Sequence, residues 1–265
     1  MKIALIDSGL GLLPAAAAVR RLRPDAELVL SSDPDGVPWG PRTPEDITAH
    51  ALATARAAAA HRPDALVIAC NTASVHALTA LRAELEPAIP VIGTVPAVKP
   101  AAAAGGAVAI WATPATTGSP YQRRLIADFA GTARVTEVPC PGLADAVQWA
   151  DEDAVNRAIA AAAALTPDDV SAVVLGCTHY ELVAERIRAA VQTAARPAGL
   201  PPVRLHGSAG AVAAQTLRRL DTDPAPSATP ASALAVLLSG RPGTLPPAAL
   251  AYAEGRLLAA TAPAT

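Results

Sequence analysis

Short apolar runs alternate with longer Ala-rich segments along most of the chain, and this alternation constrains the fold more than any other feature. Strands of about 4–8 residues separated by helices of about 10–15 residues are typical of βαβ units and parallel sheets. The runs predict strands over Lys2–Asp7, Glu27–Ser31, Ala65–Cys70, Val91–Gly93, Ala107–Ala112, Arg134–Val138, Val170–Gly176, Val203–His206 and Leu234–Leu238. Helices are predicted over Ala15–Arg23, Pro44–His61, Ser74–Leu85, Tyr121–Ala130, Asp153–Leu165 and Leu182–Ala194. The sequence therefore predicts an α/β fold with mainly parallel sheets.

Two segments that contain cysteine repeat one local pattern. Ala65-Leu-Val-Ile-Ala-Cys70-Asn-Thr and Val173-Val-Leu-Gly-Cys177-Thr-His each combine an apolar strand, a cysteine at its end and two small or polar residues. A chain of 265 residues is long enough for two lobes of roughly 110–150 residues each. The repetition predicts two similar lobes, and Thr222–Ser232, rich in Pro, Ala, Ser and Thr, is expected to be an exposed linker.

Composition excludes several classes of protein. Apolar residues make up 52% and charged residues 17% of the chain, which excludes a disordered protein. A formal net charge of −2 gives no basic field for nucleic acid or an anionic membrane, and every apolar stretch is shorter than the roughly 20 residues of a membrane span. The apolar run before Asp7 is too short for a signal-peptide core, and three scattered cysteines form no disulfide framework, so a reducing cytoplasm is expected.

Nucleotide and metal motifs are missing from the sequence. Gly9-Leu10-Gly11 lacks the third glycine of a dinucleotide loop, no GxxxxGK[ST] motif occurs, and the cysteines have no CxxC spacing. Neither Lys2 nor Lys99 is well placed for a Schiff base with pyridoxal phosphate. We therefore expect neither a cofactor nor a metal.

The candidate chemical groups lie where predicted strands end. In parallel sheets, ligands bind at the carboxyl ends of the strands, where Asp7, Cys70 and Cys177 stand. A free thiol has a pKa of about 8.5, so a thiol base near neutral pH needs a helix N-terminus or a neighbouring group. Asp7 is the nearest acid on the edge of Cys70, and His179 follows Cys177 by two residues.

The remaining cysteine and histidines are assigned structural or solvent-facing positions. Cys140 is flanked by prolines and followed by no polar residues, so it is expected to be a buried apolar side chain. His50, His61 and His76 fall in Ala-rich helical stretches and are expected to face solvent.

These residues resemble the cofactor-independent glutamate racemases of the aspartate/glutamate racemase superfamily, nearly from end to end. The motifs that carry the resemblance are Ile6-Asp7-Ser8-Gly9-Leu10-Gly11, Val37-Pro38-Trp39-Gly40, Ala69-Cys70-Asn71-Thr72-Ala73-Ser74, the pair Thr113 and Thr116, and Leu175-Gly176-Cys177-Thr178-His179-Tyr180. The two cysteine motifs at this separation are highly specific. The resemblance implies a first lobe of residues 1–92 with 207–265, a second of residues 93–206, and an active site in the cleft between them.

The resemblance also implies a mechanism with two bases. One cysteine thiolate removes the Cα proton of glutamate and the opposite thiol returns a proton to the other face, with Asp7 assisting Cys70 and His179 assisting Cys177. The residues implied to bind the substrate are Ser8, Pro38, Trp39, Gly40, Asn71, Thr72, Thr113, Thr116 and Thr178. The expected protein is a cytoplasmic isomerase that supplies D-glutamate for peptidoglycan and binds a small amino acid without cofactor or metal. A homodimer is one assembly that the resemblance leaves open.

Several departures from the family pattern leave alternatives open, among them Leu12 in place of the second glycine of the opening motif and a shorter spacing from Ser119 to Tyr121. The family usually has a glutamate where Gln148 stands, and a tyrosine where Trp39 stands. One alternative is a relative that racemises another acidic substrate such as aspartate, or that acts on an arylmalonate, a maleate or a hydantoin. The other is a catalytically weak protein that binds an amino acid.

Overall fold

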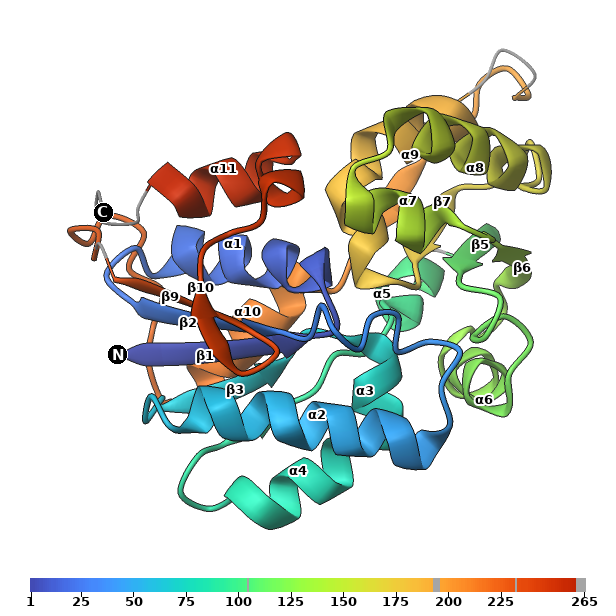
Figure 1. Cartoon of the computed structure of the whole chain (residues 1–265). Coiled ribbons are helices and arrows are strands. Elements are labelled where there is room, and N and C mark those ends of the chain that lie inside the picture. The colour runs from blue at the N-terminus through green and yellow to red at the C-terminus, as the bar shows by residue number, and fades with distance from the viewer. Residues whose placement is uncertain (104, 193–195, 232, 261–265) are drawn as a thin grey trace. The chain divides into compact units, whose positions relative to one another are not determined.

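The computed structural model describes residues 1–103, 105–192, 196–231 and 233–260. The chain forms two compact units: unit 1 contains Met1–Val95 and Ser208–Thr265, and unit 2 contains Pro96–Gly207. Each unit is a sheet covered by helices, so the predicted α/β class with mainly parallel sheets is confirmed (Figure 1). The end of the predicted helix Leu182–Ala194 and the end of the predicted linker Thr222–Ser232 lie outside the described residues.

The sheet of unit 1 has six strands in the order β10-β9-β2-β1-β3-β4. Their bounds are β1 Lys2–Asp7, β2 Glu27–Ser32, β3 Ala65–Ile68, β4 Val91–Ile92, β9 Leu234–Leu238 and β10 Arg241–Gly243. All neighbouring pairs are parallel except β9 with β10. Because β1 lies between β2 and β3 in parallel register, the carboxyl ends of these three strands meet at one edge of the sheet.

Helices cover both faces of this sheet (Figure 1). One face carries α2 (Pro44–Ala59), α3 (Asn71–His76) and α4 (Leu78–Leu85), and the other carries α1 (Leu13–Leu22), α10 (Ala209–Arg219) and α11 (Ala253–Ala260), with short 3₁₀ turns η1 (Leu10–Leu12) and η3 (Pro247–Ala251). Helix α2 begins where Thr43 caps it by accepting a hydrogen bond from the amide of Asp46. Its small apolar face packs with Ile6 and Ile68 into one core, which explains why these strands are apolar on both sides.

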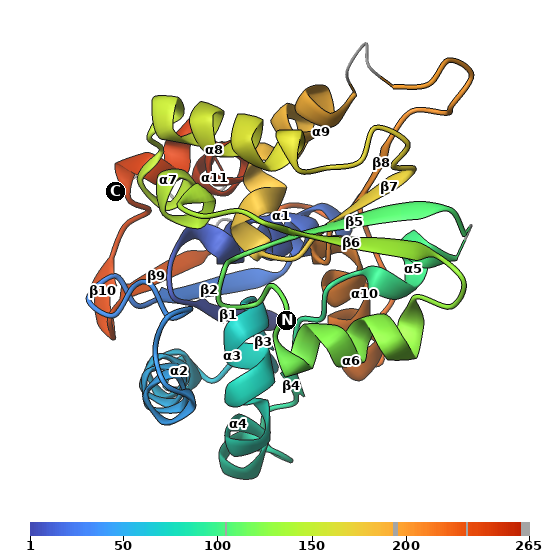
Figure 2. The same ribbon diagram turned by 90° about the vertical axis from the view of Figure 1, so that its right-hand side faces the viewer.

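The sheet of unit 2 is fully parallel, with the strand order β6-β5-β7-β8. The strands are β5 Ala107–Ala112, β6 Arg134–Pro139, β7 Ala172–Leu175 and β8 Arg204–His206. Figure 2 shows α5 (Val98–Ala102) and α6 (Pro120–Phe129) on one face, and α7 (Leu143–Trp149), α8 (Glu152–Ala164) and α9 (Ala184–Val191) on the other, with the 3₁₀ turn η2 (Thr178–Val183) following β7. β5 therefore lies beside β7, and the residues that follow these two strands are neighbours.

The predicted elements differ from the observed ones mainly at their ends. The strands predicted over Lys2–Asp7, Ala107–Ala112 and Leu234–Leu238 have the observed bounds. Both cysteine strands end earlier than predicted, because β3 stops at Ile68 and β7 at Leu175, so each cysteine lies in the connection beyond its strand. The helix predicted over Ser74–Leu85 is two helices, α3 and α4, which meet at Ala77.

Candidate active site

Three neighbouring strand ends gather polar side chains in unit 1. Asp7 ends β1, Asp33 follows β2 directly, and Cys70 follows β3 by two residues. Backbone hydrogen bonds join these ends, since the amide of Asp33 donates to the carbonyl of Ser8 at 3.2 Å and the amide of Ala69 donates to that of Ile6 at 2.8 Å. The parallel register thus brings together residues that are more than 60 positions apart in the sequence.

Asp7 is completely buried in this edge. Burial raises the pKa of its carboxyl group from 3.8 to about 7, although the Cys70 side chain and the backbone amides of Ser8, Gly9 and Gly11 act in the opposite direction. A carboxyl group with such a pKa is present in both protonation states near neutral pH. It can therefore take a proton from the neighbouring thiol or return one to it.

Cys70 stands at the entrance of α3 with an extended backbone, at φ −137° and ψ 122°. It is 8% exposed and belongs to the same apolar core as Ile6, Ile68 and Trp39, so little water reaches the sulfur. Asn71 and Ser8 are also buried, whereas Thr72 is half-buried in the first turn of α3. Asp7, Ser8, Cys70 and Asn71 are thus all found at the edge where the sequence predicts them.

The side chain of Asp33 holds the predicted binding segment Pro38–Gly40 through a hydrogen bond with Trp39. Trp39 is buried, and its Nε1 donates a hydrogen bond of 3.1 Å to Asp33 Oδ2, while Pro38 is exposed and Gly40 half-buried. The Asp33 carboxylate also lies 2.7 Å from His50 Nδ1, and its Oδ1 accepts a hydrogen bond from Ser239 Oγ at 2.9 Å.

The prediction that His50 faces solvent holds only in part, because its side chain is 30% exposed while its ring contacts Asp33. His76, in contrast, is exposed, and His61 is half-buried in the turn after α2. Asp33 is a residue that sequence reasoning missed. Its position at the end of a predicted strand, as for Asp7, is the signal that could have found it.

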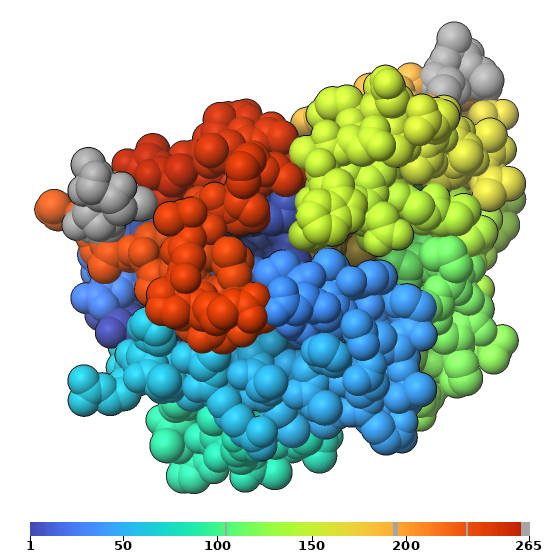
Figure 3. All heavy atoms as spheres, viewed as in Figure 1, coloured from blue at the N-terminus to red at the C-terminus, as the bar shows by residue number. Residues whose placement is uncertain are grey.

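The face of unit 1 seen in Figure 3 shows how this segment is held. The chain around α2, in light blue, lies beside the β9–β10 segment in orange-red. Besides the bond from Ser239 to Asp33, an ion pair of 2.7 Å joins Arg241 to Asp35 across this boundary. The segment that contains Pro38–Gly40 is therefore anchored by residues from the C-terminal part of the chain.

Unit 2 gathers a second set of polar side chains at the ends of β5 and β7. Thr113 follows β5, and its hydroxyl lies 3.1 Å from that of Thr116 in the next turn. Cys177 follows β7 with φ −133° and ψ 136°, nearly the backbone conformation of Cys70. Thr178 and His179, both buried, form the start of η2. The repetition seen in the sequence is therefore a repetition of local structure, although Cys177 precedes a 3₁₀ turn rather than an α-helix.

His179 lies between Cys177 and a residue from a helix that the sequence analysis did not predict. Its Nδ1 is 3.8 Å from Cys177 Sγ, and its Nε2 is 3.0 Å from Oε1 of Gln148 on α7. Burial lowers the pKa of His179 from 6.5 to about 4, so the imidazole is neutral at neutral pH. A neutral imidazole beside a thiol can accept its proton and return it.

Cys140 has a different environment from the other two cysteines. It is buried, its thiol lies 3.5 Å from the carbonyl of Val138, and burial raises its pKa to about 12. A thiol that ionises so weakly is a poor base. The prediction of a buried apolar role for Cys140 agrees with this geometry.

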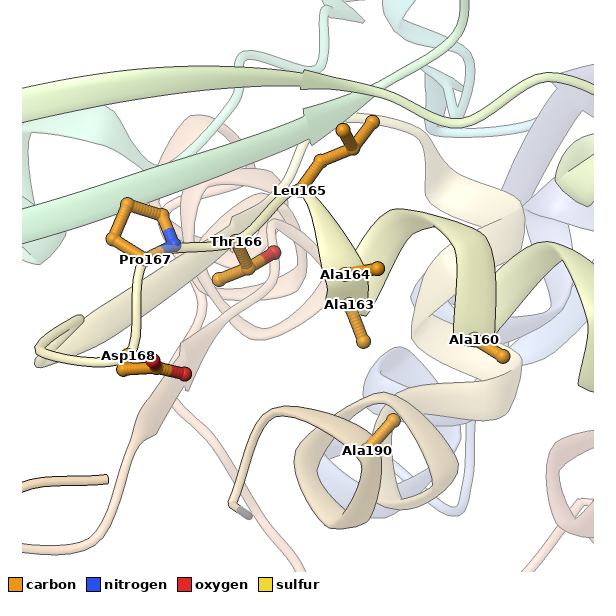
Figure 4. A pocket seen from close by; sticks show the side chains of 8 residues that line it. All are labelled: Ala160, Ala163, Ala164, Leu165, Thr166, Pro167, Asp168 and Ala190. Carbon is orange, nitrogen blue, oxygen red and sulfur yellow. The ribbon is translucent and has the colours of Figure 1, made fainter. Parts of the chain in front are cut away.

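Other features carry no comparable chemistry. Figure 4 shows a pocket at the end of α8, which is lined by Ala160, Ala163, Ala164, Leu165, Thr166, Pro167, Asp168 and Ala190. Half of its lining residues are alanines, and none is a predicted site residue. Among the described residues, no group of three or more His, Cys, Asp or Glu side chains is placed to hold a metal ion, and no described helix is long and apolar enough to cross a membrane.

Comparisons with known proteins agree on one family. The sequence model of the Asp/Glu/Hydantoin racemase family matches residues 13–209. The chain is 38% identical over 192 residues to the glutamate racemase of Roseiflexus sp. (strain RS-1), covering 71% of this chain and 70% of that protein. It is 33% identical over 250 residues to the glutamate racemase of Pseudomonas putida strain KT2440, covering 92% of this chain and 90% of that protein.

A solved structure extends the similarity to the fold. The crystal structure of Escherichia coli glutamate racemase in complex with L-glutamate and the activator UDP-MurNAc-Ala matches with a TM-score of 0.78 at 27% identity, and the match covers 98% of this chain and 95% of that one. The family match spans both cysteine segments, from before Cys70 to beyond Cys177. The chain therefore belongs to the Asp/Glu/Hydantoin racemase family of isomerases.

Proposed function

We propose that this enzyme interconverts L- and D-glutamate by proton transfer at Cα, without a cofactor, and that Cys70 and Cys177 are its two acid–base groups. The observation that carries the proposal is the repeated arrangement of a cysteine beyond a parallel strand, each beside a group that can exchange its proton. Asp7 is that group for Cys70, and His179 for Cys177. The glutamate racemases among the relatives support glutamate as the substrate.

Each half-reaction moves one proton. In one direction the Cys70 thiolate, formed when its proton passes to Asp7, takes the proton from Cα, and the electron pair of the C–H bond stays on Cα and spreads into the α-carboxylate. The Cys177 thiol then gives its proton to the opposite face of Cα and becomes a thiolate. The reverse direction exchanges the two roles. Cys70 and Asp7 are both buried, and His179 is buried beside the half-buried Cys177, so little water reaches the groups that exchange these protons.

The substrate carries two carboxylates and an ammonium group, which need donors and acceptors fixed before the reaction. We assign this role to the polar side chains around the two cysteines and to the backbone of the segment held by Trp39. The residues concerned are Ser8, Pro38, Trp39, Gly40, Asn71, Thr72, Thr113, Thr116 and Thr178. In the cell, the product D-glutamate would serve peptidoglycan synthesis in the cytoplasm.

Isotope exchange tests the reaction. In deuterated water, each turnover of L- or D-glutamate should place deuterium at Cα of the product, measured by ¹H NMR together with loss of optical rotation. Aspartate and a hydantoin serve as comparison substrates, because the family model covers their racemases as well. Exchange with aspartate but not glutamate would overturn the substrate, and no exchange with any of them would overturn the reaction.

Single substitutions test the two cysteines. Cys70→Ala and Cys177→Ala should each reduce racemisation by at least about 10³-fold, within the range of a lost acid–base catalyst. Each variant should keep elimination from only one enantiomer of a substrate with a β leaving group, and the two variants should prefer opposite enantiomers. Cys140→Ala is the matched control and should racemise like the wild type. Near-normal racemisation in either of the first two variants would contradict the two-cysteine mechanism.

A further inference from the structure

Gln148 forms the far end of a chain of contacts that begins at Cys177. Its Oε1 is 3.0 Å from His179 Nε2, and both side chains are buried, with exposed fractions of 8% and 6%. An amide oxygen can only accept a hydrogen bond, so the proton of a neutral imidazole in this contact is on Nε2. The lone pair of Nδ1 then points to the sulfur of Cys177, 3.8 Å away.

No neighbouring charge contributes to the shifted pKa of His179. Gln148 is neutral, and burial is the cause of the lowered pKa of His179, with no carboxylate opposing it. The titratable groups of the η2 segment and α7 are Cys177, Tyr180, the half-buried Glu181 and the exposed Asp145, and α9, which packs on η2, carries Glu185, Arg186 and Arg188; none of them is a cause of the shifted pKa of His179. An imidazolium at His179 would therefore be poorly stabilised.

We propose that Gln148 is a positioning residue, which fixes His179 as the Nε2–H tautomer so that Nδ1 accepts the thiol proton of Cys177. This proposal rests on the proposed racemase function and deepens it. When Cys177 acts as the base, its S–H bond breaks and the proton forms an N–H bond at Nδ1, while Nε2–H remains bonded to Gln148. Because the amide cannot offset the positive charge of the ring, the resting state has a neutral imidazole and a protonated Cys177. Cys177 is therefore ready as the proton donor in the direction in which Cys70 is the base, and it passes its proton to Nδ1 first in the other direction.

Nitrogen NMR reads the tautomer directly. In protein labelled with ¹⁵N-histidine, the signals of His179 are assigned by their loss in His179→Asn. We expect the protonated nitrogen to be Nε2 and the ring to stay neutral from pH 5.5 to 8, within the range in which an ordinary histidine with a pKa near 6.5 titrates. A ring protonated at Nδ1, or a charged ring at pH 7, would overturn the proposal.

Two substitutions separate the contributions of the amide. Gln148→Glu keeps an acceptor but adds a charge, so the His179 signals should titrate at a higher pH than in the wild type. Gln148→Met removes the acceptor, so both tautomers should appear, and kcat should fall by at least about tenfold while KM changes little, since a wrong tautomer impairs proton transfer. Gln122→Met is the control, because Gln122 of α6 is another buried glutamine of the same unit. It should leave the His179 spectrum unchanged.

The outcomes keep the two proposals apart. If His179 has the expected tautomer but the wild type exchanges no Cα proton, the proposed racemase function is wrong. Gln148 then still fixes the tautomer of His179, but it has no role in racemisation. If the wild type racemises glutamate and Gln148→Met retains both the single tautomer and full kcat, the function stands and the role of Gln148 is wrong. Gln148→Glu decides the matter where Gln148→Met does not fold, because glutamate matches glutamine in size.

Discussion

At the residue scale, the buried carboxyl group of Asp7 lowers the free energy of unfolding at neutral pH. A carboxyl group whose pKa is raised from 3.8 to about 7 by burial is more easily protonated in the folded chain than in the unfolded one. Its contribution to stability is therefore fully present below pH 3.8 and is lost as the pH rises through 7. A shift of this size corresponds to a loss on the order of 4 kcal/mol above pH 7. The protein thus accepts lower stability at neutral pH in return for a group that exchanges protons there.

Asp7→Asn should make this cost visible. The neutral amide cannot ionise, so the variant should unfold at a higher temperature than the wild type at pH 8, and the difference should shrink toward pH 4. Thermal denaturation followed by circular dichroism at several pH values measures it, with Asp128→Asn on the exposed face of α6 as control. Racemisation should be strongly reduced in the same variant. A variant less stable than the wild type at pH 8 would mean that the ionised carboxylate is not a burden to the fold.

The contribution of His179 to the stability of the protein should depend on pH in the opposite direction to that of Asp7. Its pKa is lowered to about 4, so the unfolded chain binds its proton first as the pH falls, and stability is lost between pH 6.5 and 4. The difference in unfolding midpoint between wild type and His179→Gln should therefore change in favour of the variant over this range. A difference independent of pH would indicate that the ring is not buried as a neutral group.

Individual residues also show what the sequence could and could not reveal. Asp7, Cys70 and Cys177 were predictable, because parallel strands deliver their terminal residues to one edge whatever the details of packing. The contacts of Asp33 with Trp39 and His50 were not predictable, since they depend on how a loop folds back over a strand end. The position of His50 on a helix suggested solvent, but one buried carboxylate was sufficient to hold the ring.

At the scale of elements, the connection after β7 depends on Gly176. A Cβ atom at this position would lie 2.7 Å from the carbonyl oxygen of Trp111, a backbone atom of the neighbouring strand. The amide of Gly176 donates a hydrogen bond to that same oxygen at 2.8 Å, which holds the cysteine connection against β5. Glycine is required here by close approach of two backbones rather than by an unusual dihedral angle.

Gly176→Ala should consequently destabilise the protein by about 1–3 kcal/mol, the usual cost of inserting a methyl group into a packed region. It should also lower kcat, because Cys177 is the next residue. Gly210→Ala is the matched control, since Gly210 lies on the exposed side of α10 with open space around it, and should be stabilising by about 0.5–1 kcal/mol. Denaturant unfolding provides both values. Equal effects of the two substitutions would contradict the close approach.

Helix α7 shows why the polar side chains of unit 2 were only partly predictable from the sequence. It has seven residues, and it lies between Gly142 and Ala150, both of which have left-handed backbone. A helix of fewer than two full turns leaves little periodicity to recognise, so Gln148 could be noted as a difference from the family but not as the partner of His179. The longer helices and the strands with continuous apolar runs were predictable, because their patterns extend over enough residues.

At the scale of the whole molecule, unit 1 is assembled from both ends of the chain. Strand β9 lies between β10 and β2, and pairs with β2 from Leu28 opposite Leu234 to Ser32 opposite Leu238. Helix α10, with Val212, Ala213 and Leu217 buried, covers the face opposite α2. The N-terminal part alone therefore has an uncovered face and an unpaired inner strand.

A chain that stops at Gly207 should accordingly fail to fold its first part. Removing Ser208–Thr265 exposes the edge of β2 and apolar surface beneath α10, so more of the shortened protein than of the full chain is expected in the insoluble fraction under the same conditions. Centrifugation of lysates and circular dichroism of any soluble material measure this. A soluble fragment with a cooperative unfolding transition would show that the C-terminal part is dispensable for unit 1.

Because unit 2 interrupts unit 1 in the sequence, the ribosome makes the last strands of unit 1 long after its first ones. A ribosome that adds about 5–20 residues per second takes roughly ten seconds or more to pass from β2 to β9, because the whole of Pro96–Gly207 is made in between. All four strands of unit 2 are synthesised before β9 and β10, the last two strands of unit 1. Through this interval the nascent chain carries an open strand edge, so its yield should respond to the pace of translation and to chaperones that shield such edges.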